Sequence, residues 1–189
     1  MFKIYAVTNR KLCKTDFREQ IERLCRHPSI SSIVLREKDL SEDEYLRLAE
    51  KIAPICEQYG QELILHTFIN AAEKINCLNI HLSISDLIKY KDVLSRFKTV
   101  GTSVHSAEQI QIANDCKVSY VFAGHIFKTD CKPDIAPRGI KFLTSAVRLS
   151  NAPVYAIGGI NSKNIESVRQ AGAAGACIMS LSMQENFEI

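Results

Sequence analysis

The sequence has no apolar run approaching the roughly 20 residues that a membrane-spanning helix needs. It also has little excess charge, because the formal net charge of its 189 residues is only +3. So small a positive charge gives no general attraction to nucleic acid. The sequence also shows no helix-turn-helix motif in addition to its other elements. The N-terminal stretch MFKIYAVTNRK predicts a strand rather than a signal peptide. Nucleic-acid binding and membrane insertion are therefore not expected.

The seven cysteines show neither a CxxC pair nor a metal-ligand spacing. An odd number of cysteines without such spacing argues against a disulfide framework. Because free thiols persist in reducing compartments, the sequence predicts a cytoplasmic protein. Its content of 46% hydrophobic and 24% charged residues is typical of globular proteins rather than disordered chains.

Short apolar, β-rich runs alternate with longer amphipathic stretches, and no linker divides them. Strands are expected at residues 2–8, 32–36, 62–66, 78–82, 99–103, 120–124, 154–158 and 176–180. Helices are expected at residues 16–26, 41–59, 106–114, 139–149 and 162–171, the second opening with a capping box. This alternation predicts one domain over residues 1–189, with a parallel sheet covered by helices.

Two α/β architectures fit this pattern: an open doubly wound sheet and a closed (β/α)8 TIM barrel. An open sheet usually has a glycine-rich turn after its first strand, whereas the turn TNRKLCK contains no glycine. Glycines instead gather around the last three strands, at Gly124, Gly158, Gly159 and Gly175. TIM barrels often bind phosphate with the loops after strands 7 and 8. We therefore predict the barrel. Only about nine residues follow the last strand, so the C-terminal helix must be shortened, and its exposed flank suggests a homodimer.

A phosphate site is expected where the seventh and eighth strands end. The segment AIGGI contains Gly158 and Gly159, whose backbone N–H groups can approach an anion closely. From Asn161 the chain is expected to open a helix whose N-terminus favours negative charge. Met179 and Ser180 end the eighth strand and can face the same anion. The alternative is a tight turn that needs glycine for steric reasons alone.

Further candidate binding residues end other strands. Arg36 and Lys38 point the same way, because alternate residues of an extended chain do so. Two cations there suit a phosphate or a carboxylate, although Glu37 could pair with either, and a solvated charge cluster is the alternative. Ser103 stands at the mouth of the fifth strand and is expected to contact a ligand, whereas a structural role is expected for His105.

The segment GHIFKTDCKPDIAPRG, after the sixth strand, forms a long loop rich in proline and charge. Long ordered loops in compact domains are usually binding loops or lids. His125 directly follows the strand, where a barrel places its catalytic groups, and a histidine can move protons near neutral pH. We predict that His125 is catalytic; the alternative is a histidine that caps its own loop. Thr129 and Lys132 follow it, and Cys131 is interpreted as a bystander thiol.

Together these segments resemble the thiamine phosphate synthase superfamily of barrels, from IYAVTNR through VLREKDL, HLSISDL, GTSVHS, YVFAGHIFKTDCK and PVYAIGGI to GAAGACIMS. In this family the synthases join a pyrimidine diphosphate to a thiazole phosphate. They hold Mg²⁺ with two aspartates, one in an Asn-Asp pair after the third strand and one in an HLGQxD segment. Here His66 and Thr67 replace the pair. Asp86 keeps the second aspartate, while Ser83 and Ile84 replace Gly and Gln.

The sixth-strand loop departs from the synthase pattern GPxFxTxTK, because His125 replaces the proline and Cys131 the second threonine. GHxFxTDCK is similar to the thiazole tautomerase branch, in which the histidine is the acid–base residue. That resemblance implies an isomerase of thiamine biosynthesis that aromatises a carboxythiazole phosphate by moving a proton between two carbons. No cofactor is expected for it.

The expected function is therefore a metal-independent thiazole tautomerase with His125 as its catalytic residue. The substrate, a small thiazole phosphate, is expected to be bound by Arg36, Lys38, Ser103, Thr129, Lys132, Gly158, Gly159, Met179 and Ser180. One alternative is a divergent thiamine phosphate synthase, with Mg²⁺ at Asp86. Another is a non-catalytic thiazole-phosphate-binding or regulatory protein.

Overall fold

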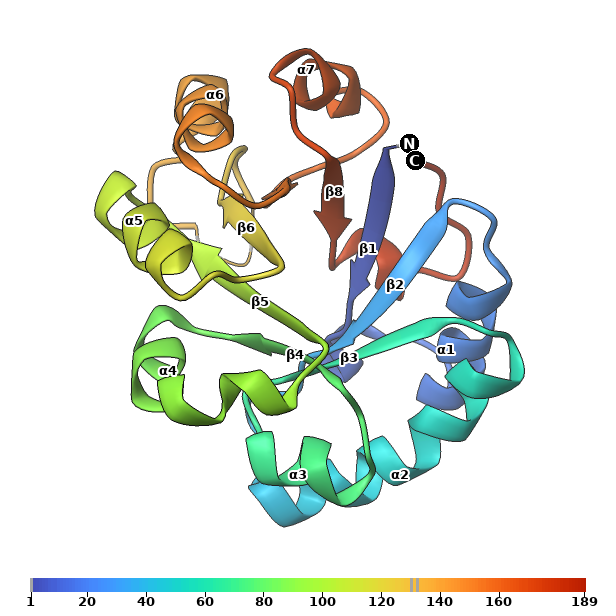
Figure 1. Cartoon of the computed structure of the whole chain (residues 1–189). Helices are drawn as coiled ribbons and strands as arrows, with labels where there is room; N and C mark the ends of the chain where they lie inside the picture. The colour runs from blue at the N-terminus through green and yellow to red at the C-terminus, as the bar shows by residue number, and fades with distance from the viewer. Residues whose placement is uncertain (1, 130, 132) are drawn as a thin grey trace.

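Eight parallel strands close into a barrel in the order β1 to β8, with helices around it (Figure 1). The computed structural model of the chain describes residues 2–129, 131 and 133–189. The strands are β1 (Lys3–Val7), β2 (Ile30–Leu35), β3 (Glu62–His66), β4 (Asn79–Leu82), β5 (Thr99–Val104), β6 (Tyr120–Gly124), β7 (Val154–Ile157) and β8 (Gly175–Ile178). The predicted (β/α)8 TIM barrel is confirmed.

Helices follow the strands in the described part of the chain. They are α1 (Phe17–Arg26), α2 (Glu42–Gln58), α3 (Ile69–Lys74), α4 (Ile84–Lys89), α5 (Ala107–Asp115), α6 (Gly139–Leu149) and α7 (Ile165–Gln170). Short 3-10 helices are η1 (Arg10–Leu12), η2 (Lys91–Arg96) and η3 (Leu181–Met183). The expected capping box of Ser41 and Glu44 opens α2.

Helix α7 begins later than its sequence pattern predicts. The expected helical stretch starts at residue 162, but the chain first makes a turn, in which Asn164 Oδ1 accepts a hydrogen bond from the Asn161 N–H at 2.9 Å. The side chain of Asn164 also donates to the Gly159 carbonyl at 2.8 Å. The helix therefore starts at Ile165, and its N-terminus does not directly follow the two glycines.

The interior of the barrel is filled by one set of alternating strand residues. This inner cluster consists of Tyr5, Val7, Val34, Ile64, Tyr120, Phe122, Tyr155 and Cys177. The other set faces the helices in a larger apolar core, as strand alternation requires. A Cβ at Gly101 would lie 2.0 Å from the Tyr120 ring, so this glycine makes room for a bulky side chain inside the barrel. Because the interior is packed, a ligand site is expected at its mouth.

After β8 the described chain forms η3 and an extended tail in place of an eighth α-helix. Gln20 of α1 is fully buried. Its side-chain amide donates to the carbonyls of Ser182 at 2.8 Å and Gln184 at 3.0 Å. Phe187 stacks on His27 with ring centroids 4.5 Å apart. The tail thus packs against α1, and the homodimer expected from a short C-terminus stays a prediction.

Among the described residues, no helix combines the length and the apolar character that a membrane span requires. All seven cysteines are free thiols, in agreement with the absence of a disulfide spacing.

We predict that Gln20→Leu lowers the free energy of unfolding by about 1–3 kcal/mol, because two backbone carbonyls lose their buried donor. Urea denaturation measures the change. Gln170→Leu is the matched control, since that glutamine is exposed; its effect should stay within about 0.5 kcal/mol. Equal stability of the Gln20→Leu protein and its parent would contradict this role.

Candidate functional site

A cavity of about 700 Å³ lies at the mouth of the barrel, where the eight strands end. Small-molecule sites typically have volumes of roughly 300–1,000 Å³. The expected site residues that line it are Arg36, Lys38, Ser103, His125, Thr129, Gly158, Gly159, Met179 and Ser180. Lys132 lies outside the described residues. The structure thus brings the described candidates together, while their individual roles stay predictions.

The described lining of this cavity carries a positive charge. Arg36 and Lys38 line it, and no aspartate or glutamate does so among the described residues. Apolar side chains such as Ile84, Ile88 and Leu181 form other parts of the wall. Such a combination suits a ligand with an anionic group and an apolar ring.

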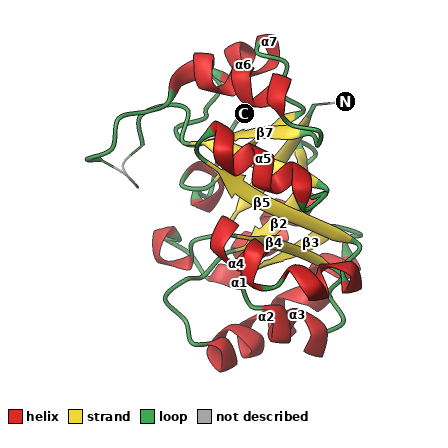
Figure 2. Cartoon of the chain, turned by 60° about the vertical axis from the view of Figure 1, so that its left-hand side comes forward, coloured by secondary structure: helices red, strands yellow, loops and turns green. Residues whose placement is uncertain are grey.

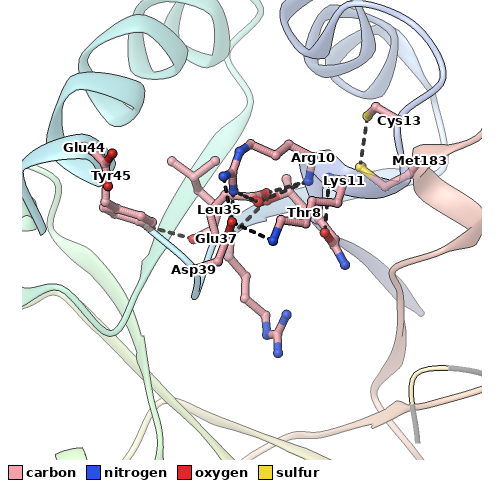
Figure 3. A network of polar contacts seen from close by, with 12 residues as sticks. Thr8, Arg10, Lys11, Cys13, Leu35, Glu37, Asp39, Glu44, Tyr45 and Met183 are labelled. Atoms are coloured by element: carbon pink, nitrogen blue, oxygen red, sulfur yellow. Dashed lines mark hydrogen bonds and ion pairs between the residues drawn. The ribbon is translucent and has the colours of Figure 1, made fainter. Parts of the chain in front are cut away.

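Glu37, which could have neutralised the neighbouring cations, points to the loop after β1 instead (Figure 3). Its side chain is 1% exposed and accepts a hydrogen bond from Thr8 Oγ1 at 2.7 Å. It also accepts from the backbone N–H and the guanidinium of Arg10, each at 3.0 Å. Thr8 Oγ1 in turn accepts from the Arg36 N–H at 2.9 Å. This network fixes the backbone at Arg36 and commits the carboxylate of Glu37 to Arg10.

Asp39 completes the network at the surface. Its two carboxylate oxygens accept from the Arg10 guanidinium at 2.7 Å each. Hydrogen bonds from Arg10 and then Lys11 hold the pKa of Asp39 well below its usual value. Both acids that flank Lys38 in sequence are therefore turned toward the β1 loop.

His81 on β4 is a buried polar residue that the sequence analysis did not single out. Its Nδ1 lies 3.1 Å from the Tyr120 hydroxyl and its Nε2 lies 2.9 Å from Ser103 Oγ. Burial lowers the pKa of His81 to about 3, with smaller contributions from Lys38 and Arg36. A neutral His81 that accepts from Tyr120 donates to Ser103, so the Ser103 hydroxyl proton can point into the cavity. The signal in the sequence is the alternation that places residue 81 on the inner face of its strand.

His125 lines the cavity and also contacts its own loop. It is 5% exposed, and its Nε2 lies 3.1 Å from the carbonyl oxygen of Ile135. The described part of this loop projects from the barrel at the left of Figure 2. The ring is thus at the cavity, as predicted, and a carbonyl acceptor fixes Nε2 as the protonated nitrogen.

The two glycines after β7 allow close contact between two loops. Gly158 has a φ of +99°, and a Cβ there would lie 2.3 Å from the Cβ of His125. A Cβ at Gly159 would lie 2.3 Å from the carbonyl oxygen of Lys128. Backbone pairing continues the contact, since the Phe127 N–H donates to the Gly158 carbonyl at 3.0 Å. Steric need therefore accounts for these glycines, and their contact with phosphate stays a prediction.

A smaller cavity of about 210 Å³ adjoins the ends of β3 and β4. It is lined by Glu37, Lys38, His66, Thr67, Phe68, Ser83 and Asp86, and His66 also lines the larger cavity. The Nδ1 of His66 lies 2.7 Å from Thr67 Oγ1. Burial lowers the pKa of His66 well below its ordinary value, so its imidazole is neutral at pH 7.

The residues of the smaller cavity do not fit a magnesium ion. Mg²⁺ prefers octahedral oxygen ligands and is usually bound through carboxylates. Glu37 is committed to Thr8 and Arg10, and Asp86 accepts a hydrogen bond from Ser83 Oγ at 2.6 Å. Within the described ranges, no group of three His, Cys, Asp or Glu side chains could hold a metal ion.

Comparison with known proteins gives a consistent result. The family model described as thiamine monophosphate synthase matches residues 4–181. A thiamine-phosphate synthase of Clostridium acetobutylicum is 32% identical, over 95% of this chain and 86% of that protein. A putative thiamine-phosphate synthase 2 of Aquifex aeolicus is 29% identical, over 96% of this chain and 98% of the relative. The solved thiamine phosphate pyrophosphorylase of Pyrococcus furiosus shares the fold, with a TM-score of 0.84, 24% identity and coverage of 97% and 89%.

These relatives overturn the expectation of a tautomerase. The curated relatives that match most of this chain at about 30% identity bear the name of a synthase, which is a transferase and not an isomerase. The interpretation of the sixth-strand loop as an isomerase motif is therefore wrong. A single histidine in a short motif is weaker evidence of the activity than similarity over the whole chain.

We predict that Glu37→Gln lowers the free energy of unfolding by about 1.5–3 kcal/mol, because hydrogen bonds to a charged buried group are lost. Urea denaturation at pH 7 measures this. Asp39→Asn is the matched control, since its side chain bonds the same Arg10 but is 37% exposed; about 0–1 kcal/mol is expected. A larger loss in Asp39→Asn than in Glu37→Gln would contradict the importance of the buried carboxylate.

We also predict that stability falls as the pH drops below about 6.5, the ordinary pKa of histidine. The unfolded chain then takes up a proton that folded His81 binds only near pH 3, so the folded state is disfavoured. The slope reaches about 1.4 kcal/mol per pH unit for one such group. Urea midpoints between pH 7 and 5 should decline less steeply in His81→Gln than in the parent or in His27→Gln. Equal slopes in all three proteins would rule out this effect.

Proposed function

The chain belongs to the thiamine monophosphate synthase family, and we propose that it is a transferase that forms thiamine phosphate from a pyrimidine diphosphate and a thiazole phosphate. The reaction breaks the bond between the pyrimidine-bearing carbon and the diphosphate. The leaving oxygen keeps the electron pair, and the thiazole nitrogen donates its lone pair to form the new carbon–nitrogen bond. No net oxidation or reduction takes place.

The observation that carries the proposal is the cationic mouth of the barrel, which no acid lines among the described residues. Negative charge develops on the departing diphosphate, and preorganised donors aimed at developing charge are a major source of catalysis. Arg36 and Lys38 line the cavity, and Glu37 is committed to Arg10 and Thr8. These two cations therefore compensate the charge of the leaving group.

The other half of the mouth suits the thiazole phosphate. Gly158, Gly159, Met179 and Ser180 follow β7 and β8 and line the same cavity. We assign the monophosphate to these residues, because loops after strands 7 and 8 of TIM barrels often bind phosphate. Ser103 offers its hydroxyl from the β5 side.

His125 has a positioning role in this proposal. The transfer requires no proton shuttle between carbons, and the Nε2 of His125 lies 3.1 Å from the Ile135 carbonyl. The ring thereby fastens the loop that carries Thr129, which lines the cavity. The imidazole forms part of the wall against which the substrates lie.

The test is to mix the purified protein with both substrates, with and without Mg²⁺, and to follow thiamine phosphate by chromatography. Turnover is expected, and Arg36→Met should lower kcat/KM by about 100-fold or more, because one donor to developing charge is removed. Lys141→Met, an exposed change on α6, should leave kcat/KM unaltered. Binding of thiazole phosphate without any product would overturn the proposal in favour of a non-catalytic binding protein.

A further inference from the structure

Strand β3 ends at His66, and the ring of this histidine contacts the side chain of the next residue, Thr67. Thr67 has a φ of +74°, in the left-handed region. Glycine, asparagine and aspartate tolerate this region, whereas a β-branched residue there is an outlier. Backbone outliers of this kind cluster at functional sites. The conformation of the backbone therefore does not explain why threonine occupies this position, and its hydroxyl contact with His66 offers a reason.

The pair of His66 and Thr67 is a neutral hydrogen-bond donor. A neutral imidazole carries one N–H and the threonine one O–H, and only one of these two hydrogens lies between Nδ1 and Oγ1. Whichever tautomer is present, the other hydrogen can be donated to a ligand. His66 lines both cavities, so this donor stands where the larger cavity meets the smaller one.

The surroundings of the pair favour an anion. Arg36 and Lys38 line the larger cavity together with His66, and Lys38 also lines the smaller one. No acid lines the larger cavity within the described part of the chain. In the smaller one, Glu37 is paired with the guanidinium of Arg10, whereas Asp86 is bonded to the uncharged hydroxyl of Ser83, so the larger cavity is the side that favours an anion. An anionic oxygen beside His66 would thus be attracted by two cations.

We propose that His66 and Thr67 bind a diphosphate oxygen directly, in place of a divalent cation held by carboxylates. The proposal rests on the proposed function in taking a diphosphate as the ligand. Arg36 and Lys38 compensate its charge, and the pair adds a hydrogen bond to an ionised acceptor, which is stronger than one between neutral groups. Binding of the diphosphate therefore does not depend on Mg²⁺.

Isothermal titration of the protein with inorganic pyrophosphate, in EDTA and in excess Mg²⁺, tests this. The parent should bind pyrophosphate in EDTA, and Mg²⁺ should not tighten the binding. His66→Phe, which keeps a ring but has no donor, should weaken binding in EDTA by about 10-fold. His66→Gln keeps an amide donor and should stay within about threefold of the parent. His27→Phe controls for loss of a histidine elsewhere.

A second pair of variants tests the position of Thr67. Thr67→Asp places a carboxylate in the smaller cavity with Asp86, and aspartate tolerates a positive φ. It should weaken pyrophosphate binding in EDTA by at least about 10-fold through charge repulsion, and Mg²⁺ should restore much of the loss. Thr67→Asn, equally tolerant of the backbone conformation but uncharged, should bind in EDTA nearly as the parent does.

Two results would overturn the inference: parent binding that is at least about 10-fold tighter in Mg²⁺ than in EDTA, or parent-like binding by a His66→Phe protein. Thermal unfolding establishes that each variant is folded. If His66→Phe does not fold, the Thr67 variants test whether the His66–Thr67 pair binds pyrophosphate. Binding and turnover are measured separately. Pyrophosphate binding in EDTA without thiamine phosphate formation would reject the proposed function alone, whereas Mg²⁺-dependent binding with product formation would reject this inference alone.

Discussion

The electrostatics of the cavity depend on the direction of one buried carboxylate. Glu37 stands between Arg36 and Lys38 in sequence, and a contact with either would cancel half of the positive charge. Hydrogen bonds from Thr8 and Arg10 turn it away from the cavity instead. Because an ionised group is costly to bury without partners, this carboxylate requires the loop after β1 to keep its shape. The anion binding that we propose at the end of β2 is thus linked to the loop after β1.

The strands could be predicted well because their signal is local. Strands β3 and β6 have the predicted bounds, since apolar β-rich runs buried on both faces have clear ends. Helices α3 and α4 were missed, because each has six residues and too few turns to show a helical period. The convergence of the candidate binding residues followed from the fold alone, since the carboxyl ends of barrel strands meet at one mouth.

The contacts that set the chemistry could not be predicted, because they join residues far apart in the chain. Glu37 meets the Arg10 side chain across 27 positions, and His81 meets Tyr120 across 39. Neither pairing has a local pattern. The isomerase hypothesis failed for a related reason: the loop motif around His125 is short, whereas the similarity to the synthases extends over 95% of the chain. Similarity over the whole chain is therefore stronger evidence for the family than a motif of a few residues.

Closure of the barrel also determines when the strands can pair during synthesis. Strand β1 pairs with β2 on one side and with β8 on the other, where Lys3 lies opposite Gly175. Strand β1 therefore gains its second neighbour only after the strands from β2 to β8 have been synthesised. Pairing between such distant segments is slow, because the entropy of a long loop is lost before the contact forms. Until then the nascent sheet has two open edges, and these are the surfaces that a chaperone would need to shield.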